Sequence, residues 1–139
     1  MKIKPYSSSI LILSGVVLMA MGAYFIFLRP PLLHEDLRYM NLALLDVSNT
    51  IPGLESWLRK VFWVLGGYIF ATGLLTAFIA STSFRRREPG AFSIVALSGI
   101  TSIGLMTIVN FMIDSDFKWI LLAFILPWAI ALILYRYYK

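Results

Sequence analysis

Four long runs of hydrophobic residues divide the chain, and none of them contains a charged side chain. They cover Ser9–Leu28, Val61–Phe84, Ala91–Ile113 and Trp119–Tyr135. A helix of roughly 20 mostly apolar residues is long enough to cross about 30 Å of hydrocarbon. The pattern therefore predicts an all-α integral membrane protein, a bundle of four transmembrane helices that forms a single domain over residues 1–139.

A different pattern fills the long segment between the first two runs, residues 29–60. Polar and charged residues there alternate with hydrophobic residues that recur every three or four positions. The hydrophobic residues are Leu33, Leu37, Met40, Leu44 and Val47. This spacing predicts an amphipathic helix over Glu35–Val47, on the outer membrane surface or over the mouth of the bundle. Thr50 is expected to cap a further helix that has Pro52 in its first turn and continues into the second span.

Composition agrees with the membrane class and excludes several kinds of chemistry. The chain is 60% hydrophobic and its mean hydropathy is +0.83. A net charge of +5 could indicate a nucleic-acid partner in a soluble protein. Here the charge is expected on one side of the membrane, where it sets the topology, so no nucleic acid is expected. The chain has no cysteine, which excludes disulfides, thiolate catalysis and cysteine-ligated metal.

The distribution of basic residues predicts the orientation, because cytoplasmic segments carry more Lys and Arg. One side of the membrane would carry Lys2, Lys4, Arg85, Arg86, Arg87, Arg136 and Lys139; the other would carry Arg29, Arg38, Arg59, Lys60 and Lys118. Both termini and the Arg85–Gly90 loop are therefore predicted in the cytoplasm, with 29–60 and 114–118 outside. The two short loops predict that the second and third helices, and the third and fourth, are antiparallel neighbours.

Small residues repeat at heptad spacing on the first two spans. They are Gly15 and Gly22 on the first, and Gly66, Gly73 and Ala80 on the second. Small residues let helix backbones approach closely in lipid, so the repeat predicts tight contacts between helices. The alternative interpretation is space for a lipid or another ligand.

The third span is the most polar, and it suggests where a site would lie. Thr107, Asn110 and Asp114 are three and four residues apart, so they share one face near the outer end. The Asn110 amide needs a partner in hydrocarbon, either on another helix or in a polar pocket. Trp128 follows Pro127 in the fourth span, and its indole N–H is expected either to bond to the third helix or to line a cavity.

No span contains an ionisable residue, which argues against proton-coupled transport. The single histidine, His34, belongs to a His34-Glu35-Asp36 cluster in the outer loop. Adjacent residues on a helix point in different directions, so this run is a poor chelate, and we predict no catalytic residue, metal or cofactor. The sequence leaves open whether the chain is an enzyme, although the lack of predicted catalytic residues argues against it.

Three functions are compatible with these features. The first is a non-enzymatic membrane protein that binds lipid or another hydrophobic ligand, or that serves as an accessory subunit with other membrane-protein subunits or its own copies. The second is an oligomeric passive channel or facilitator, and the third is a lipid-modifying enzyme at the outer headgroup level. The predicted ligand-binding residues lie beneath or on the outer loop: Asn110, Thr107, Asp114, Trp128, Tyr39, His34, Glu35 and Asp36.

Overall fold

The computed structural model of the chain describes residues 4–137, and within them all side chains except those of residues 4, 5 and 48. Lys2 and Lys139, which contribute to the predicted charge asymmetry, lie outside the described residues. Four helical stretches are long and apolar enough to cross a membrane: Tyr6–Phe27, Leu54–Phe84, Ala91–Met112 and Lys118–Tyr137. The predicted number and order of long apolar helices are therefore confirmed, and they make the chain a candidate multi-pass membrane protein.

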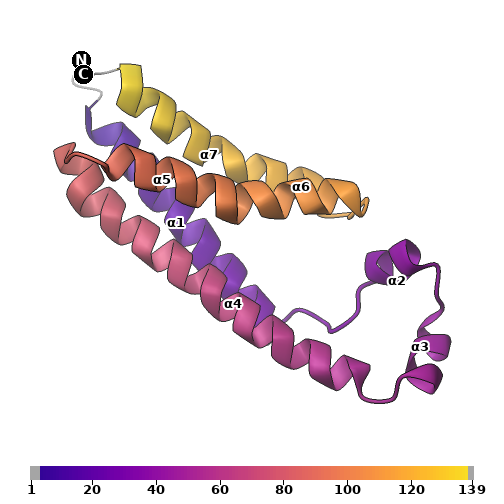
Figure 1. Cartoon of the computed structure of the whole chain (residues 1–139). Coiled ribbons are helices and arrows are strands. Elements are labelled where there is room, and N and C mark those ends of the chain that lie inside the picture. Colours follow the sequence, from indigo (N-terminus) through magenta and orange to yellow (C-terminus); the bar gives the residue numbers. More distant parts are fainter. Residues whose placement is uncertain (1–3, 138–139) are drawn as a thin grey trace.

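The helices form two pairs arranged as a V (Figure 1). The first pair is α1 (Lys4–Phe27) and α4 (Leu54–Ile79), which is extended by a π-helical turn, η1 (Ala80–Phe84). In the second pair, the third apolar helix is divided into α5 (Ala91–Gly99), the π-helical turn η2 (Ile100–Gly104) and α6 (Leu105–Met112), and it packs on α7 (Lys118–Tyr137). The pairs meet near the ends of the chain and diverge toward α2.

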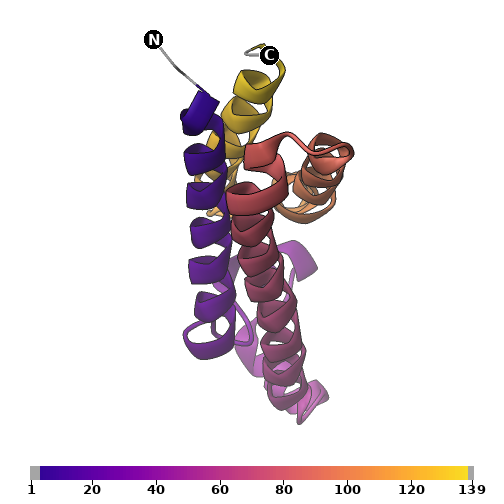
Figure 2. The ribbon, with the colours of Figure 1, turned by 90° about the vertical axis from the view of Figure 1, so that its left-hand side faces the viewer.

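Close contact between α1 and α4 follows from their glycines. A Cβ added to Gly15 would lie 2.7 Å from the carbonyl oxygen of Gly73, and one added to Gly22 would lie 2.6 Å from that of Gly66. Figure 2 shows the two helices side by side over most of their length. The predicted small-residue contact is confirmed, and it explains why α4 packs along α1 rather than along α5.

Aromatic side chains close the narrow end of the V. The ring of Tyr135 on α7 lies 4.3 Å from the ring of Phe84 and 5.6 Å from that of Phe92, measured between centroids. The Arg87 guanidinium lies 4.5 Å from the same Tyr135 ring. The turn that joins α4 to α5 is therefore anchored on α7. The second and third spans are antiparallel, but they contact each other mainly near this turn.

The prediction of a single amphipathic helix over Glu35–Val47 is wrong. Two short helices replace it, α2 (His34–Met40) and α3 (Leu44–Thr50). Asn41 between them has a left-handed backbone, with φ of 54°, and this conformation ends α2. Val47 is buried, whereas Met40 and Leu44 are exposed on the protein surface, so the apolar stripe is not packed as one continuous face.

The predicted start of the next helix is also wrong by a few residues. Thr50 is the last residue of α3 rather than a cap. Gly53 adopts φ of 100°, which favours glycine, and α4 begins directly after it at Leu54. From there the helix continues without a break into the second span, as predicted.

Candidate ligand-binding cavity

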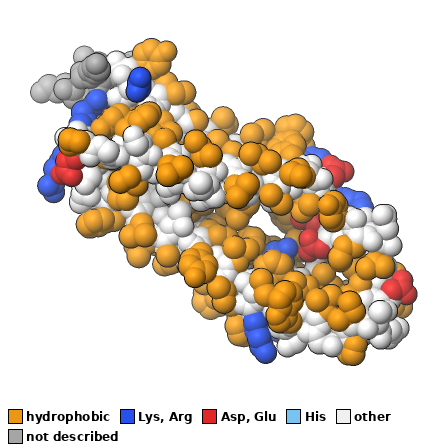
Figure 3. All heavy atoms as spheres, in the orientation of Figure 1, with side chains coloured by type: hydrophobic (Ala, Val, Ile, Leu, Met, Phe, Trp, Pro, Cys, Tyr) orange, Lys and Arg blue, Asp and Glu red, His pale blue; other side chains and the backbone are white. Residues whose placement is uncertain are grey.

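The space between the two helix pairs contains a cavity of about 750 Å³. Its walls come from α1 and α4 on one side and from η2, α6 and α7 on the other, and residues of α2 and the segment before it line one end. Figure 3 shows the hollow between the pairs, surrounded mainly by hydrophobic side chains, with charged side chains at one edge. A volume of this size is in the usual range for small-molecule sites.

The deep end of the cavity reaches the core of the bundle. Leu18, Ile69, Ile103 and Leu121 line it, one from each of the four apolar helices, and all four belong to the buried core. From Leu18 to Arg29, α1 and the residues after it follow the cavity for about 16 Å, at 1.5 Å per residue. That length is roughly half the hydrocarbon thickness of a bilayer.

Three polar residues within this apolar lining donate to their own helices. The Thr72 hydroxyl donates to the Tyr68 carbonyl at 2.8 Å, and the Thr101 hydroxyl to the Leu97 carbonyl at 2.9 Å. The Asn110 amide nitrogen donates to the Met106 carbonyl at 2.8 Å. Such bonds return the donor to the backbone one turn earlier. One N–H of the Asn110 amide is therefore satisfied within its own helix, and the side chain also lines the cavity.

Arg29 is the basic residue of the cavity lining and lies at its α2 end. Its guanidinium carbon is 3.5 Å from the centre of the Phe62 ring, and one of its terminal nitrogens is 3.4 Å from Asp36 Oδ2. Only 10% of the Arg29 side chain is exposed. Burial lowers the pKa of Arg29 from its usual value, and the neighbouring Asp36 carboxylate opposes this shift.

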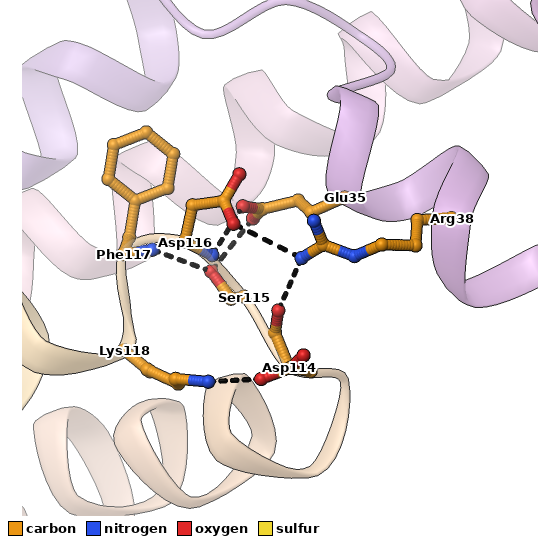
Figure 4. Close-up of polar contacts among 7 residues, drawn as sticks. All are labelled: Glu35, Arg38, Asp114, Ser115, Asp116, Phe117 and Lys118. Carbon is orange, nitrogen blue, oxygen red and sulfur yellow. Dashed lines mark hydrogen bonds and ion pairs between the residues drawn. The ribbon is translucent and has the colours of Figure 1, made fainter.

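Helix α2 reaches across the open end of the V and binds the loop before α7 through Glu35. One oxygen of the Glu35 carboxylate accepts a hydrogen bond from the Ser115 hydroxyl at 2.8 Å, and the other accepts one from the Asp116 backbone N–H at 2.9 Å (Figure 4). Glu35 is only 4% exposed and Ser115 is fully buried. Hydrogen bonds to a carboxylate are among the stronger ones in proteins, so Glu35 attaches α2 to the second helix pair.

A second, exposed contact lies beside the first. Arg38 on α2 donates to the Asp114 backbone carbonyl at 2.6 Å and to the Asp116 carboxylate at 3.1 Å (Figure 4). Lys118 pairs with the Asp114 carboxylate, and its hydrogen bond and charge lower the pKa of Asp114. Among the described residues, no group of three or more His, Asp or Glu is placed to hold a metal ion.

The structure divides the predicted site residues into two groups. Asn110, Glu35 and Asp36 line the cavity. The remaining predicted residues do not line it: Thr107, Asp114, Trp128, Tyr39 and His34. The Trp128 indole donates to the Val95 carbonyl at 3.1 Å, which is the first of its two predicted alternatives, and the Thr107 hydroxyl bonds to the Ile103 carbonyl on its own helix.

Sequence reasoning missed Arg29, Phe62 and Ser115. In the sequence Arg29 indicates only topology, and nothing in the pattern relates it to Phe62 on a later helix. Ser115 did carry a signal, because serine is favoured just before a helix, and its hydroxyl accepts a hydrogen bond from the Phe117 N–H at 3.1 Å. Its second role, as a donor to Glu35, depends on the approach of α2.

Comparison of the chain with protein-family models, with curated proteins and with solved structures finds no match.

Proposed function

We propose that this chain is a multi-pass membrane protein that binds a lipid or another hydrophobic ligand between its two helix pairs. The observation that carries the proposal is the cavity of about 750 Å³, which has an apolar lining and charged residues at one end. A binding site for an apolar molecule typically combines such a lining with a few polar groups that orient the ligand. The proposal assigns no chemical reaction to the chain.

The bonding of the polar lining residues favours binding over conduction. A channel lined by the third span would need hydroxyl and amide groups that face an aqueous path. The Thr101 hydroxyl and the Asn110 amide nitrogen instead donate to carbonyls of their own helix, which supports an apolar cavity wall.

The test fills the cavity from both sides. In the variant Thr72→Trp/Val109→Trp, both substituted residues line the cavity, one on α4 and one on α6. The matched control Ala71→Trp/Ile108→Trp changes their sequence neighbours, which are exposed and do not line the cavity. Native mass spectrometry after purification in a mild detergent would count the lipid molecules that each protein retains.

We expect the parent protein and the control variant to retain bound lipid, and the cavity-filled variant to lose most of it. Equal retention by the two variants would show that any bound lipid sits outside the cavity. If the parent protein retains no lipid after purification and binds none that is added, the proposed function is contradicted directly.

A further inference from the structure

From the charged end of the cavity we infer the class of ligand: an uncharged single-chain amphiphile whose head carries a hydroxyl group, of the monoacylglycerol kind. This inference rests on the proposed function. It adds the direction in which the ligand lies and the chemistry of its head, with the head beside Arg29 and Asp36 and the chain directed toward the deep end.

The shape of the cavity supports a single-chain molecule. The cavity follows α1 and the residues after it for about 16 Å, roughly one leaflet of a bilayer, from Arg29 at the charged end to buried residues such as Leu18 and Ile103. Thr72 and Thr101 direct their hydroxyl donors to backbone carbonyls, so neither donor is directed at the cavity. An acyl chain fits such a space, and its head would lie where the apolar helix ends.

The balance of charge at the other end supports an uncharged head. Arg29 and Asp36 are paired, so together they present no net charge. Glu35 also lines this end and keeps its negative charge, but both of its carboxylate oxygens are engaged by hydrogen bonds from the Ser115–Asp116 segment. An anionic head would lie against the Asp36 and Glu35 carboxylates, whereas a cationic head would lie against the Arg29 guanidinium.

The pair nevertheless offers both kinds of hydrogen bond to a neutral head. Arg29 has five N–H donors; it bonds to the Pro30 carbonyl at 3.0 Å and pairs with Asp36 at 3.4 Å. The Oδ2 atom of Asp36 accepts from the Leu33 N–H at 2.9 Å, and a carboxylate has acceptor capacity beyond that bond. A glycerol ester supplies carbonyl oxygens for Arg29 and hydroxyl groups for Asp36.

The experiment compares three lipids that share one chain and differ in the charge of the head. Monopalmitoylglycerol is neutral, palmitoyl lysophosphatidate is anionic and palmitoylcholine is cationic. Equal amounts are offered together to the purified full-length protein in detergent, and native mass spectrometry resolves the bound species by mass. We expect monopalmitoylglycerol to exceed each charged lipid by about tenfold, the effect of roughly one charge-assisted hydrogen bond.

Charge-changing variants test whether the pair causes this preference. Asp36→Asn leaves Arg29 unpaired and should shift binding toward lysophosphatidate, whereas Arg29→Gln should shift it toward palmitoylcholine. The double variant Arg29→Gln/Asp36→Asn has the parent's net charge and should restore the preference for the neutral lipid. This restoration also distinguishes an effect on selectivity from misfolding of either single variant.

The results separate this inference from the proposed function. Preference of the parent protein for either charged lipid, or unchanged ratios in both single variants, would overturn the inference about the head. If all three lipids bind equally and Thr72→Trp/Val109→Trp loses all of them, the cavity remains the site and only the inference about the head fails. If none of the three binds but the parent protein retains another lipid that Thr72→Trp/Val109→Trp loses, only the inference about the ligand fails; if no lipid binds at all, both fail.

Discussion

At the scale of single residues, Gly99 shows how one position organises the second helix pair. The indole of Trp128 lies directly against Gly99, where a Cβ atom would come 2.4 Å from the indole nitrogen and 2.7 Å from Cε2. In this position the indole N–H donates to the Val95 carbonyl. The absence of a side chain at Gly99 therefore allows a large aromatic residue to be buried between α5 and α7 with its polar group satisfied.

We predict that Gly99→Ala destabilises the protein by about 1–3 kcal/mol, the usual cost of overpacking a well-packed core. The added methyl group would displace the indole and weaken its hydrogen bond to Val95. Denaturant unfolding in detergent measures the change. Gly67→Ala is the control, because nothing lies within 4 Å of its added Cβ and alanine favours a helix over glycine. Equal stability of the two variants would show that Trp128 adapts without loss.

At the scale of elements, α2 connects the two helix pairs across the open end of the cavity. It is short, and isolated helices of this length are unstable in water. Its position therefore depends on tertiary contacts, chiefly those of Glu35 with Ser115 and with the Asp116 N–H. Arg38 adds an exposed contact, and exposed ion pairs contribute little stability.

We predict that Glu35→Ala releases α2 from the α6–α7 loop, because both Glu35 hydrogen bonds are lost. The expected loss of stability is about 2 kcal/mol, the size of a hydrogen bond to a charged group. The chain has no cysteine, so spin labels can be placed uniquely at Tyr39→Cys and Met112→Cys. Electron paramagnetic resonance should show a narrow distance distribution in the parent and a broad one in the variant.

The control for this prediction is Glu55→Ala, which removes an exposed carboxylate from the first turn of α4. It should leave both the distance distribution and the unfolding free energy unchanged. A narrow, parent-like distribution in Glu35→Ala would show that other contacts are sufficient to hold α2 in place.

At the scale of the whole molecule, the two ends of the V differ in packing and in charge. The narrow end has the aromatic contacts of Tyr135 and the exposed Arg85 and Arg86. The open end carries most of the acidic residues, among them Glu35 and Asp114. The run Arg85-Arg86-Arg87 in the short turn at the narrow end is the basis for proposing that this end faces the cytoplasm.

We predict that an impermeant thiol reagent applied to intact cells labels Ser56→Cys but not Pro89→Cys. Ser56 is exposed in the first turn of α4, and Pro89 is exposed in the turn before α5. After the cells are opened, both positions should react, which controls for accessibility. Labelling of Pro89→Cys alone in intact cells would reverse the proposed orientation.

The amino-acid sequence is sufficient to predict which segments are long apolar helices and where α1 and α4 are able to approach closely. Both are local properties, because they depend on the hydropathy and side-chain size of residues close together in the chain. The order of the helices and the continuation of α4 into its span could be read in the same way. The break at Asn41 could not, because the periodic apolar pattern continues through it.

The divergence of the two helix pairs around a cavity could not be predicted from the sequence, because it depends on contacts between distant segments. At the charged end of the cavity, Arg29 contacts the Phe62 ring, and a hydrogen bond between Ser115 and Glu35 holds α2 across the open end. These partners lie far apart in the chain, and nothing in the local pattern around one of them specifies the other. Their proximity depends on how the helix surfaces pack, and that packing is set by all the contacts of the bundle together.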